Sequence, residues 1–497
     1  MFTWVVDVLL LGAVLQPSVA YLSSRAGMRR LTPLFCIVVL GISMALFYPL
    51  YGEVSQGIVL VPVAASILGS ALEVDGLGIF VGLVAVLLGL LSAIFSFRYM
   101  EHDSGLGGYY TLLILMTAGM VGIAFAGDLF TLYVFWEITS ITSYVLVAFR
   151  KDQWEAVEAG FKYLIMSASG SAILLLAFSL LYGMTGTLNL AGMASVMKRT
   201  PLADSPWLWL TFLLVTVGFG VKAAIVPLHT WLPDAHPAAP SPVSALLSGI
   251  VIETAVYAFS RILFTVFSPA ALSWAMFIAV LCLVTMTTGN IMALLQNDVK
   301  RLLAYSSIAQ VGYILVGLAA GTRMGVTGSV LHILNHALMK GSAFLCAGAF
   351  IHSVGSRDLS ELAGIGRRMP ASATAFAISL FALAGTPPLN GFISKVLLFA
   401  GAFEAGMSWL AIAGVLNSVL SLAYYLRLML TFINPRPSER VRVAKEAPIS
   451  MLAPILTMTV LIVIFGVWPD PAIAFADKAA AALMNVEAYT SAVVRPP

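Results

Sequence analysis

Long apolar runs separated by short polar segments dominate the chain from end to end. A membrane-spanning helix needs about 20 predominantly apolar residues, and about fourteen runs of this kind can be marked along the sequence. They lie near residues 3–22, 31–50, 75–97, 108–126, 129–149, 156–183, 206–226, 241–265, 270–293, 303–320, 325–353, 371–400, 407–432 and 449–468. The pattern predicts an all-α polytopic membrane protein with about fourteen transmembrane helices.

Three segments depart from this pattern. The stretch 51–74 is apolar but interrupted by glycines and Pro62, so we expect a re-entrant or hairpin element there. The segment 228–240 is too polar and too rich in proline to span, so we expect a loop or a surface helix. After Pro469 the sequence AIAFADKAAAALMNV is weakly amphipathic, which predicts a helix lying on or beside the membrane.

Two of the apolar runs combine a lysine with a proline break. In GFGVKAAIVPLHTWLP, Lys222 precedes Pro227 by five residues, and in LAGTPPLNGFISKVLLF, Lys395 follows Pro388 by seven. A lysine at membrane depth costs about 2.5–3.5 kcal/mol on insertion scales, so it is rare and usually functional. Such breaks in corresponding halves of a chain are typical of ion paths built from inverted repeats. The sequence therefore predicts an ion-translocating membrane protein.

The order of the runs predicts an internal repeat. Five helices between residues 108 and 265 form one set, five more between 270 and 432 form another, and the fourth of each set is broken. Because five is odd, the second set starts from the opposite membrane face, so the repeats are inverted. We expect N-terminal helices in 1–107, repeats in 108–265 and 266–432, and a C-terminal helix and tail in 433–497.

Composition excludes a soluble protein. The 497 residues are 60% hydrophobic and 10% charged, with a mean hydropathy of +0.98, whereas soluble domains carry about 25% charged residues. The net charge of +3 gives no reason to expect a nucleic-acid partner. Cys36, Cys282 and Cys346 lie in apolar runs without CxxC spacing, so we expect packed thiols and no disulfide or metal site. The first run lacks a basic leader and carries Asp7, which favours a retained span over a cleaved signal peptide.

Lysine and arginine are unevenly distributed between the loops. Loops after odd-numbered runs hold sixteen and loops after even-numbered runs hold four, namely Lys198, Arg199, Arg261 and Arg323. Cytoplasmic loops carry the excess of these residues. We therefore expect the odd-numbered loops in the cytoplasm, both termini on the other side, and a location in the inner (cytoplasmic) membrane.

Glu137 and Lys222 are the first candidates for chemistry. Glu137 lies in the middle of an apolar run, in YVFWEITS, and belongs to the same five-helix set as Lys222. A buried acid beside a buried base can stay charged, and separating the two favours release of the lysine proton because burial disfavours the ammonium. We interpret them as a proton-moving pair. A static ion pair is the structural alternative, although buried pairs are poor stabilisers.

A second group lies in and around the second set. His332, His336 and Lys340 are spaced i, i+4 and i+8, which places them on one helical face. Without a nearby carboxylate or cysteine the two histidines make a weak metal site, so a proton path is favoured over metal binding; histidines bonded to backbone carbonyls are the structural alternative. Lys395 is followed by more apolar residues and has no ready route to water, against the alternative of a snorkelling anchor. Glu253 is a third acid at membrane depth.

The remaining candidates are weaker. His229, Asp234 and His236 in PLHTWLPDAHPAAP could line a water entrance or cap the break. The sequence contains no GxGxxG after a strand, no P-loop, no HExxH and no cysteine ligand set. We therefore expect no cofactor, no metal and no redox chemistry in this chain, which leaves open whether it belongs to an enzyme complex.

Several motifs resemble one family. KAAIVPLHTWLPDAHPAAPSPVSALLSG, VFWEITS, NDVKRLLAYSSIAQVGYILVGL, LNHALMKGSAFLCAG and GTPPLNGFISK are similar to the antiporter-like subunits shared by respiratory complex I, membrane-bound hydrogenases and Mrp cation/proton antiporters. The resemblance runs from about Asp75 to about Arg427. It implies fourteen core helices, two inverted five-helix repeats, a row of buried charges, and other membrane subunits as partners.

The resemblance also implies residue roles. Glu137 matches the acid of the family's pair, Lys222 its pumping lysine and Lys395 its terminal lysine, while His332 and His336 match the connecting axis. The family usually places a lysine or histidine where this chain has Glu253, so the usual lysine-to-lysine relay is in doubt here. The PPLNGFISK form favours the Mrp and membrane-bound hydrogenase branch.

Three hypotheses follow. The first is a proton-translocating subunit of a larger membrane complex of the Mrp, hydrogenase or complex I type. The second is a sodium/proton antiporter module driven by ion gradients without a redox partner. The third is a non-pumping scaffold, which the combination of Glu137, Lys222 and Lys395 disfavours.

Overall fold

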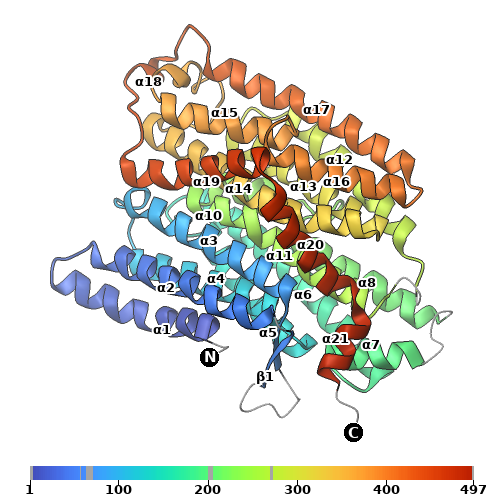
Figure 1. The fold of residues 1–497 in the computed structure, drawn as a ribbon. Coiled ribbons are helices and arrows are strands. Elements are labelled where there is room, and N and C mark those ends of the chain that lie inside the picture. The colour runs from blue at the N-terminus through green and yellow to red at the C-terminus, as the bar shows by residue number, and fades with distance from the viewer. Residues whose placement is uncertain (1–3, 56, 63–70, 200–204, 269–271, 495–497) are drawn as a thin grey trace.

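Long helices packed side by side make up most of the molecule (Figure 1). The structure, a computed structural model, describes residues 4–55, 57–62, 71–199, 205–268 and 272–494. Within these residues, twelve helices are long and apolar enough to cross a membrane. In lipid a helix satisfies its backbone hydrogen bonds internally, which is why the apolar runs become helices. The predicted all-α polytopic fold is confirmed, and the count of fourteen is compatible with twelve such helices plus shorter apolar ones.

A β-hairpin interrupts the N-terminal helices. These helices are α1 (Trp4–Arg25), α2 (Leu31–Val54) and α3 (Gly76–Tyr99). Between α2 and α3, strand β1 (Val59–Pro62) pairs antiparallel with β2 (Ala71–Val74). A hairpin was one of the two alternatives predicted for residues 51–74, and these strands confirm it; residues 63–70 lie outside the described part of the chain.

The first predicted set of helices contains one broken member. Its elements are α4 (Leu106–Phe125), α5 (Leu129–Val147), α6 (Trp154–Thr185), α8 (Pro206–Lys222), α9 (Leu232–Ala238), α10 (Ser241–Leu246), the π-helical turn η1 (Leu247–Val251) and α11 (Ile252–Thr265). The chain leaves the helical path after Lys222, where Ala224 has a φ of 55°. The amphipathic helix α7 (Leu190–Arg199), which follows α6, was not predicted because it is too short to give an apolar run.

The second predicted set is also interrupted once. Its elements are α12 (Ala275–Leu294), α13 (Val299–Ala320), α14 (Arg323–Val354), the 3₁₀ turn η2 (Ile365–Arg367), α15 (Pro370–Ala384), α16 (Asn390–Glu404) and α17 (Ser408–Phe432). The single apolar run predicted at 371–400 is therefore two helices, α15 and α16. Both predicted breaks exist, and each contains a cis peptide bond before a proline, Val226–Pro227 and Pro387–Pro388.

The segment 228–240 is not the surface element that its polarity suggested. Its helix α9 is buried, with Leu232, His236 and Pro237 all shielded from solvent. It packs against α6 and α13. The prediction was wrong because most of the segment is apolar or small, including Trp231, Leu232 and Ala235, and packs inside the protein, while Asp234 stays at a half-exposed edge where it pairs with Lys162 and Arg301.

The C-terminal elements lie against the outside of the helical array. They are α18 (Glu439–Arg442), α19 (Ile449–Val467), α20 (Asp470–Met484) and α21 (Val486–Val493). Helix α20 runs obliquely across α14 and α3, toward α7 (Figure 1). Arg323 of α14 pairs with Asp477, and its hydrogen bonds hold the pKa of that carboxyl below the usual range. The predicted C-terminal helix therefore packs laterally on transmembrane helices.

A buried polar cluster joins the hairpin, α11 and the C-terminal tail. Arg261 of α11 donates two hydrogen bonds to the carboxylate of Asp75, with N–O distances of 2.6 and 2.8 Å. Glu73 of β2 accepts hydrogen bonds from Tyr489 of α21 and, at 2.8 Å, from Asn189. Arg261 is thus a buried helix residue and not one of the loop charges counted from the sequence.

We predict that Asp75→Asn destabilises the fold by about 3–5 kcal/mol, since it leaves the Arg261 guanidinium buried and without a charged partner. Thermal or denaturant unfolding of the purified protein in detergent measures this loss. The control is Glu101→Gln, which breaks the exposed Arg98–Glu101 pair and should cost less than about 1 kcal/mol. Equal stability of the two variants would contradict the prediction.

Candidate functional site

Lys222 is the last residue of α8, at the point where the helix breaks. Its side chain is only 2% exposed. The ammonium Nζ donates a hydrogen bond of 2.5 Å to Ser140 Oγ and lies 5.0 Å from the centre of the Trp136 ring. Both partners belong to α5, so this helix holds the lysine at the end of α8.

Glu137 lies on α5 between these two contacts, yet it does not pair directly with Lys222. The part of the chain that the structure describes contains no Glu137–Lys222 ion pair, and the buried Oε1 of Glu137 has no hydrogen-bond partner there. The half-buried carboxylate shares a helical face with Val134 and Ile141, which are 40% and 46% exposed. The expected direct pair is therefore absent in this conformation, although the Glu137 charge is still close enough to act on the Lys222 ammonium.

Glu253 and His336 meet in the centre of the protein. Glu253 lies two residues after the π-helical turn η1, and such turns are frequent at functional sites. Both side chains are completely buried, and Glu253 Oε1 contacts His336 Nδ1 of α14. The assumption that the histidine face lacks a carboxylate was wrong, since α11 supplies one that lies 83 residues away in the sequence. This pair can hold a proton on either partner.

His332 continues the row on the next turn of α14. The rings of His332 and His336 are nearly parallel, with centres 6.2 Å apart and an interplanar angle of 13°. His332 Nδ1 lies 2.8 Å from Ser394 Oγ and Nε2 lies 3.0 Å from Gln310 Oε1. The partners of this histidine are side chains and not the backbone carbonyls of the structural alternative. Neither Ser394 nor Gln310 was singled out from the sequence.

Lys395, adjacent to Ser394, ends the row. It is 3% exposed, and its Nζ donates to the carbonyls of Leu383 and Ala384 at 2.9 and 3.3 Å. These are the last residues of α15, so the lysine satisfies carbonyls that the break leaves without helical partners. Gly385 follows with a φ of +84°, and a Cβ there would lie 2.9 Å from Lys395 Cδ. The lysine therefore does not snorkel to the surface.

Lys340 shares the α14 face but binds a different neighbour. Its Nζ donates to the carbonyl of Leu303 at 2.8 Å and to Ser306 Oγ at 2.6 Å, both on α13. The predicted common face of His332, His336 and Lys340 is thus present. The histidines contact Glu253, Gln310 and Ser394, whereas the lysine binds the Leu303 carbonyl and Ser306.

A polar cavity of about 540 Å³ lies beside this region, between α9, α13 and the end of α14. Lys300 lines it and donates to the Ala239 carbonyl at 2.5 Å. The sequence reading placed Lys300 in a loop, but it lies in the first turn of α13 and is buried. Its position in NDVKRLLAY, directly before a long apolar run, gave no signal that distinguishes it from a loop charge.

The three weaker candidates in the segment after the first break, His229, Asp234 and His236, lie in different surroundings. Asp234 forms ion pairs with Lys162 and Arg301, at 3.1 and 2.9 Å, which is a structural role. His229 is half-buried. His236 is buried and stacks on Phe344 with ring centres 4.6 Å apart, and neither of its ring nitrogens has a hydrogen-bond partner among the described residues.

The row of Lys222, Glu253, His336, His332 and Lys395 can bind and release protons. Its members come from α8, α11, α14 and α16 and lie at or between the two helix breaks. The described residues contain no cluster of three or more metal-ligating side chains. The fold and this row define a multi-pass membrane protein with a chain of ionisable groups across its interior.

The chain belongs to the family described as NADH:quinone oxidoreductase/Mrp antiporter, TM, which matches residues 126–421. It is 35% identical over 430 residues to F(420)H(2) dehydrogenase subunit N of Methanosarcina mazei, covering 84% of this chain and 86% of the relative. It is 36% identical over 425 residues to NADH-quinone oxidoreductase subunit N of Desulforudis audaxviator, covering 81% and 83%.

Chains of solved membrane complexes share the fold of this protein over nearly its whole length. A chain of the membrane-bound sulfane sulfur reductase, an archaeal respiratory membrane complex, superposes with a TM-score of 0.89 at 29% identity, covering 99% of both chains. A chain of the Mrp complex from Dietzia sp. DQ12-45-1b gives 0.88 at 27%, covering 99% and 100%. Respiratory complex I from Thermus thermophilus gives 0.77 at 27%, covering 95% and 98%. The protein is therefore an antiporter-like membrane subunit of the complex I, Mrp and sulfur reductase type.

Proposed function

We propose that this subunit moves protons across the membrane through the buried row that connects the two broken helices. The observation that carries the proposal is the contact between Glu253 and His336, which joins the first set of helices to the second at full burial. Buried ionisable groups are expensive to keep in a membrane protein, and a static fold does not require them. Roles for Glu137, Lys222, Glu253, His332, His336, Lys340 and Lys395 are part of this proposal.

The first step takes place at Lys222. In the present conformation the ammonium binds the neutral Ser140 hydroxyl, while the Glu137 carboxylate lies one turn away on the same helix. A swing of the lysine toward Glu137 would stabilise the charged ammonium, and a swing back would favour proton release. Because Lys222 is the terminal residue of α8, its backbone is free of the helix constraint on its C-terminal side.

The later steps use the central residues. A proton that leaves Lys222 can be taken up by the Glu253–His336 pair, pass to His332, and reach Lys395 through the Ser394 hydroxyl, which lies 2.8 Å from His332. No hydrogen bond in the described residues links Lys222 to Glu253 directly, so water or a side-chain movement completes that step. Lys340 lies one turn beyond His336 and would modulate the charge of the pair.

In the leading hypothesis the subunit takes its driving force from a redox reaction carried out by partner subunits. The relatives reported above are subunits of an NADH-quinone oxidoreductase and of an F(420)H(2) dehydrogenase. The TM-score of 0.88 with the Mrp complex favours, as a second candidate, a cation/proton antiporter module without a redox partner. Other membrane subunits, lipid, and protons or sodium ions are the partners in both cases.

The organisation and orientation are proposed on the same basis. We divide the chain into N-terminal helices (1–107), two inverted repeats (108–265 and 266–432) and a C-terminal part (433–497). The broken helices α8 and α15–α16 occupy matching places in the two repeats. The excess of lysine and arginine supports a cytoplasmic position for the α1–α2 turn. The start of α1 lies on the β1 side and the end of α21 lies beside α7, at one end of the molecule (Figure 1), which supports placing the termini together on the non-cytoplasmic side.

The test is transport by the purified complex in proteoliposomes, with the internal pH and the internal sodium concentration followed separately. Proton uptake that depends on the electron donor and persists without sodium supports the leading hypothesis. Proton movement that requires an opposing sodium gradient and no electron donor would favour the antiporter alternative. A complex that transports neither ion when supplied with donor or gradient would contradict both.

A further inference from the structure

A large open cavity lies where α1 ends and α2 begins, opposite the turn between α3 and α4. Its volume is about 1100 Å³, which exceeds the range of about 300–1,000 Å³ of typical ligand pockets. None of the residues in the proton row lines it. The cavity lies at the ends of four transmembrane helices, so it opens at the surface of the membrane.

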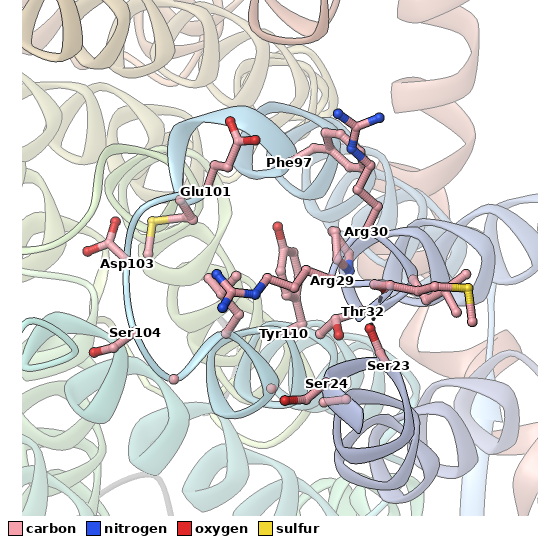
Figure 2. Close-up of a pocket in the computed structure, with 18 of the residues that line it drawn as sticks. Ser23, Ser24, Arg29, Arg30, Thr32, Phe97, Glu101, Asp103, Ser104 and Tyr110 are labelled. Atoms are coloured by element: carbon pink, nitrogen blue, oxygen red, sulfur yellow. Dashed lines mark hydrogen bonds between the residues drawn. The ribbon is translucent and has the colours of Figure 1, made fainter. Parts of the chain in front are cut away.

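Two solvent-exposed arginines in this cavity, Arg29 and Arg30, pair with none of the described residues. Figure 2 shows Arg29 and Arg30 on the α1–α2 side and Glu101 and Asp103 on the loop across from them. Among the described residues, no side chain forms an ion pair with or accepts a hydrogen bond from either arginine. The two acidic residues do not compensate them, because each already has its own arginine.

The acidic residues are neutralised from outside the cavity. Asp103 accepts two hydrogen bonds from Arg150, at 2.9 and 3.1 Å, and Glu101 pairs with Arg98. Neither Arg150 nor Arg98 lines the cavity. The charges left over in the cavity are therefore those of Arg29 and Arg30, a net excess of positive charge.

The backbone adds to this positive potential. Helix α2 begins at Leu31 and helix α4 at Leu106, and both first turns line the cavity. Neither helix has a side-chain cap, since the N-cap positions are Arg30 and Gly105. Helix N-termini carry a partial positive charge, which favours anions. In α2 this effect comes from the dipole, because the Leu31 N–H already donates to the Met28 carbonyl and Pro33 has no N–H. Two such ends together with two unpaired guanidinium groups suit a phosphate, which arginine binds through paired hydrogen bonds.

An apolar track leads away from the cavity along α2. Leu31, Leu34, Val38 and Ile42 are spaced by three or four residues and are 39%, 48%, 48% and 48% exposed. They form one stripe that starts at the rim of the cavity and runs along the transmembrane part of the helix. An acyl chain can lie on such a stripe while its headgroup stays with the arginines.

We propose that this cavity binds a phosphate group, carried by an anionic phospholipid whose headgroup contacts Arg29 and Arg30 and whose acyl chain follows the α2 stripe. Clusters of basic residues at the ends of transmembrane helices recognise anionic headgroups. A free phosphate offers the same chemistry to the arginines but makes no use of the apolar track. The bound lipid would join the α1–α2 pair to the α3–α4 turn, which face each other across the cavity.

The experiment compares three forms of the purified, delipidated complex: wild type, Arg29→Gln/Arg30→Gln, and the control Arg25→Gln/Lys151→Gln. The control removes the same charge outside the cavity, where Arg25 stacks over Tyr21. Binding of phosphatidylglycerol is measured by native mass spectrometry, with phosphatidylcholine as the neutral comparison. We expect the cavity variant to bind phosphatidylglycerol about thirtyfold more weakly, which is the fold-change for roughly 1 kcal/mol from each of two juxtamembrane arginines, and the control to bind as wild type does.

Further measurements decide between the sources of the phosphate and exclude a protein occupant. Inorganic phosphate at millimolar concentration should fail to displace the lipid if the acyl chain contributes; displacement would retain the phosphate site and make the free ion its occupant. Equal phosphatidylglycerol binding by all three forms overturns the proposal. It is also overturned if a density map of the complex shows a partner subunit's acidic side chain between Arg29 and Arg30.

Discussion

Lys222→Met and Glu137→Gln are each expected to lower proton translocation by the assembled complex about a hundredfold, the low end of what a positioned acid–base group contributes. Lys222 is the ionisable group at the break of α8, and its ammonium is held by Ser140 with Glu137 one turn away. Removing the lysine removes the group that carries the proton. Removing the charge of Glu137 removes the alternative position at which the ammonium is stabilised. Proteoliposomes loaded with a pH-sensitive dye measure the rate.

Alanine variants should give the same loss, but methionine and glutamine keep the side-chain volume and are the cleaner changes. Lys478→Met is the matched control, because that lysine is exposed on α20 and lies outside the row. Assembly is checked by the subunit content of each purified complex. Ser140→Ala separates the two contacts of the lysine: it should slow transport less than Glu137→Gln if the Ser140 contact is only the resting position. Wild-type rates in Lys222→Met or in Glu137→Gln would refute the proposed first step.

Glu253→Gln is the second change with a large expected effect, at least about a hundredfold on the transport rate. The carboxylate is completely buried against His336, and glutamine keeps its shape while removing its ability to take up a proton. Glu253→Lys installs the residue type usual in the family and places an ammonium against the imidazole of His336. We expect that variant to change the rate or the ion preference, since like charges at this distance repel.

A double-mutant cycle tests whether Glu253 and His336 act as a unit. His336→Gln alone and Glu253→Gln alone should each slow transport, and the double variant should be no slower than the worse of the two, because groups in one network are not additive. Glu404→Gln is the control, an exposed acid at the end of α16. If Glu253→Gln and Glu253→Lys both transport like wild type, Glu253 has only a structural role and the proposed central step is wrong.

The sequence interpretation misplaced Arg261, Lys300 and segment 228–240, and these errors share a cause. Arg261 and Lys300 were assigned to loops because Arg261 stands near the end of an apolar run and Lys300 just before the next one, whereas both are buried residues of helices with hydrogen-bond partners elsewhere in the protein. Segment 228–240 was assigned to the surface because of its polar residues, whereas α9 is buried. For the two basic residues a partner distant in the sequence satisfies the polar group: Asp75 for Arg261, and the Ala239 carbonyl for Lys300. A linear pattern carries no information about such partners.

The sequence by itself determined the membrane-spanning helices, the two proline breaks and the ionisable residues at membrane depth, because a lipid environment imposes a simple rule on each segment separately: about 20 apolar residues and no unsatisfied backbone group. Only the tertiary structure decided how those residues meet. It placed Glu253 against His336, set Lys222 on Ser140 instead of Glu137, and directed Lys395 to the open end of α15. These contacts depend on how helices rotate and pack against one another, which is settled by side chains from the whole array and not by any one segment.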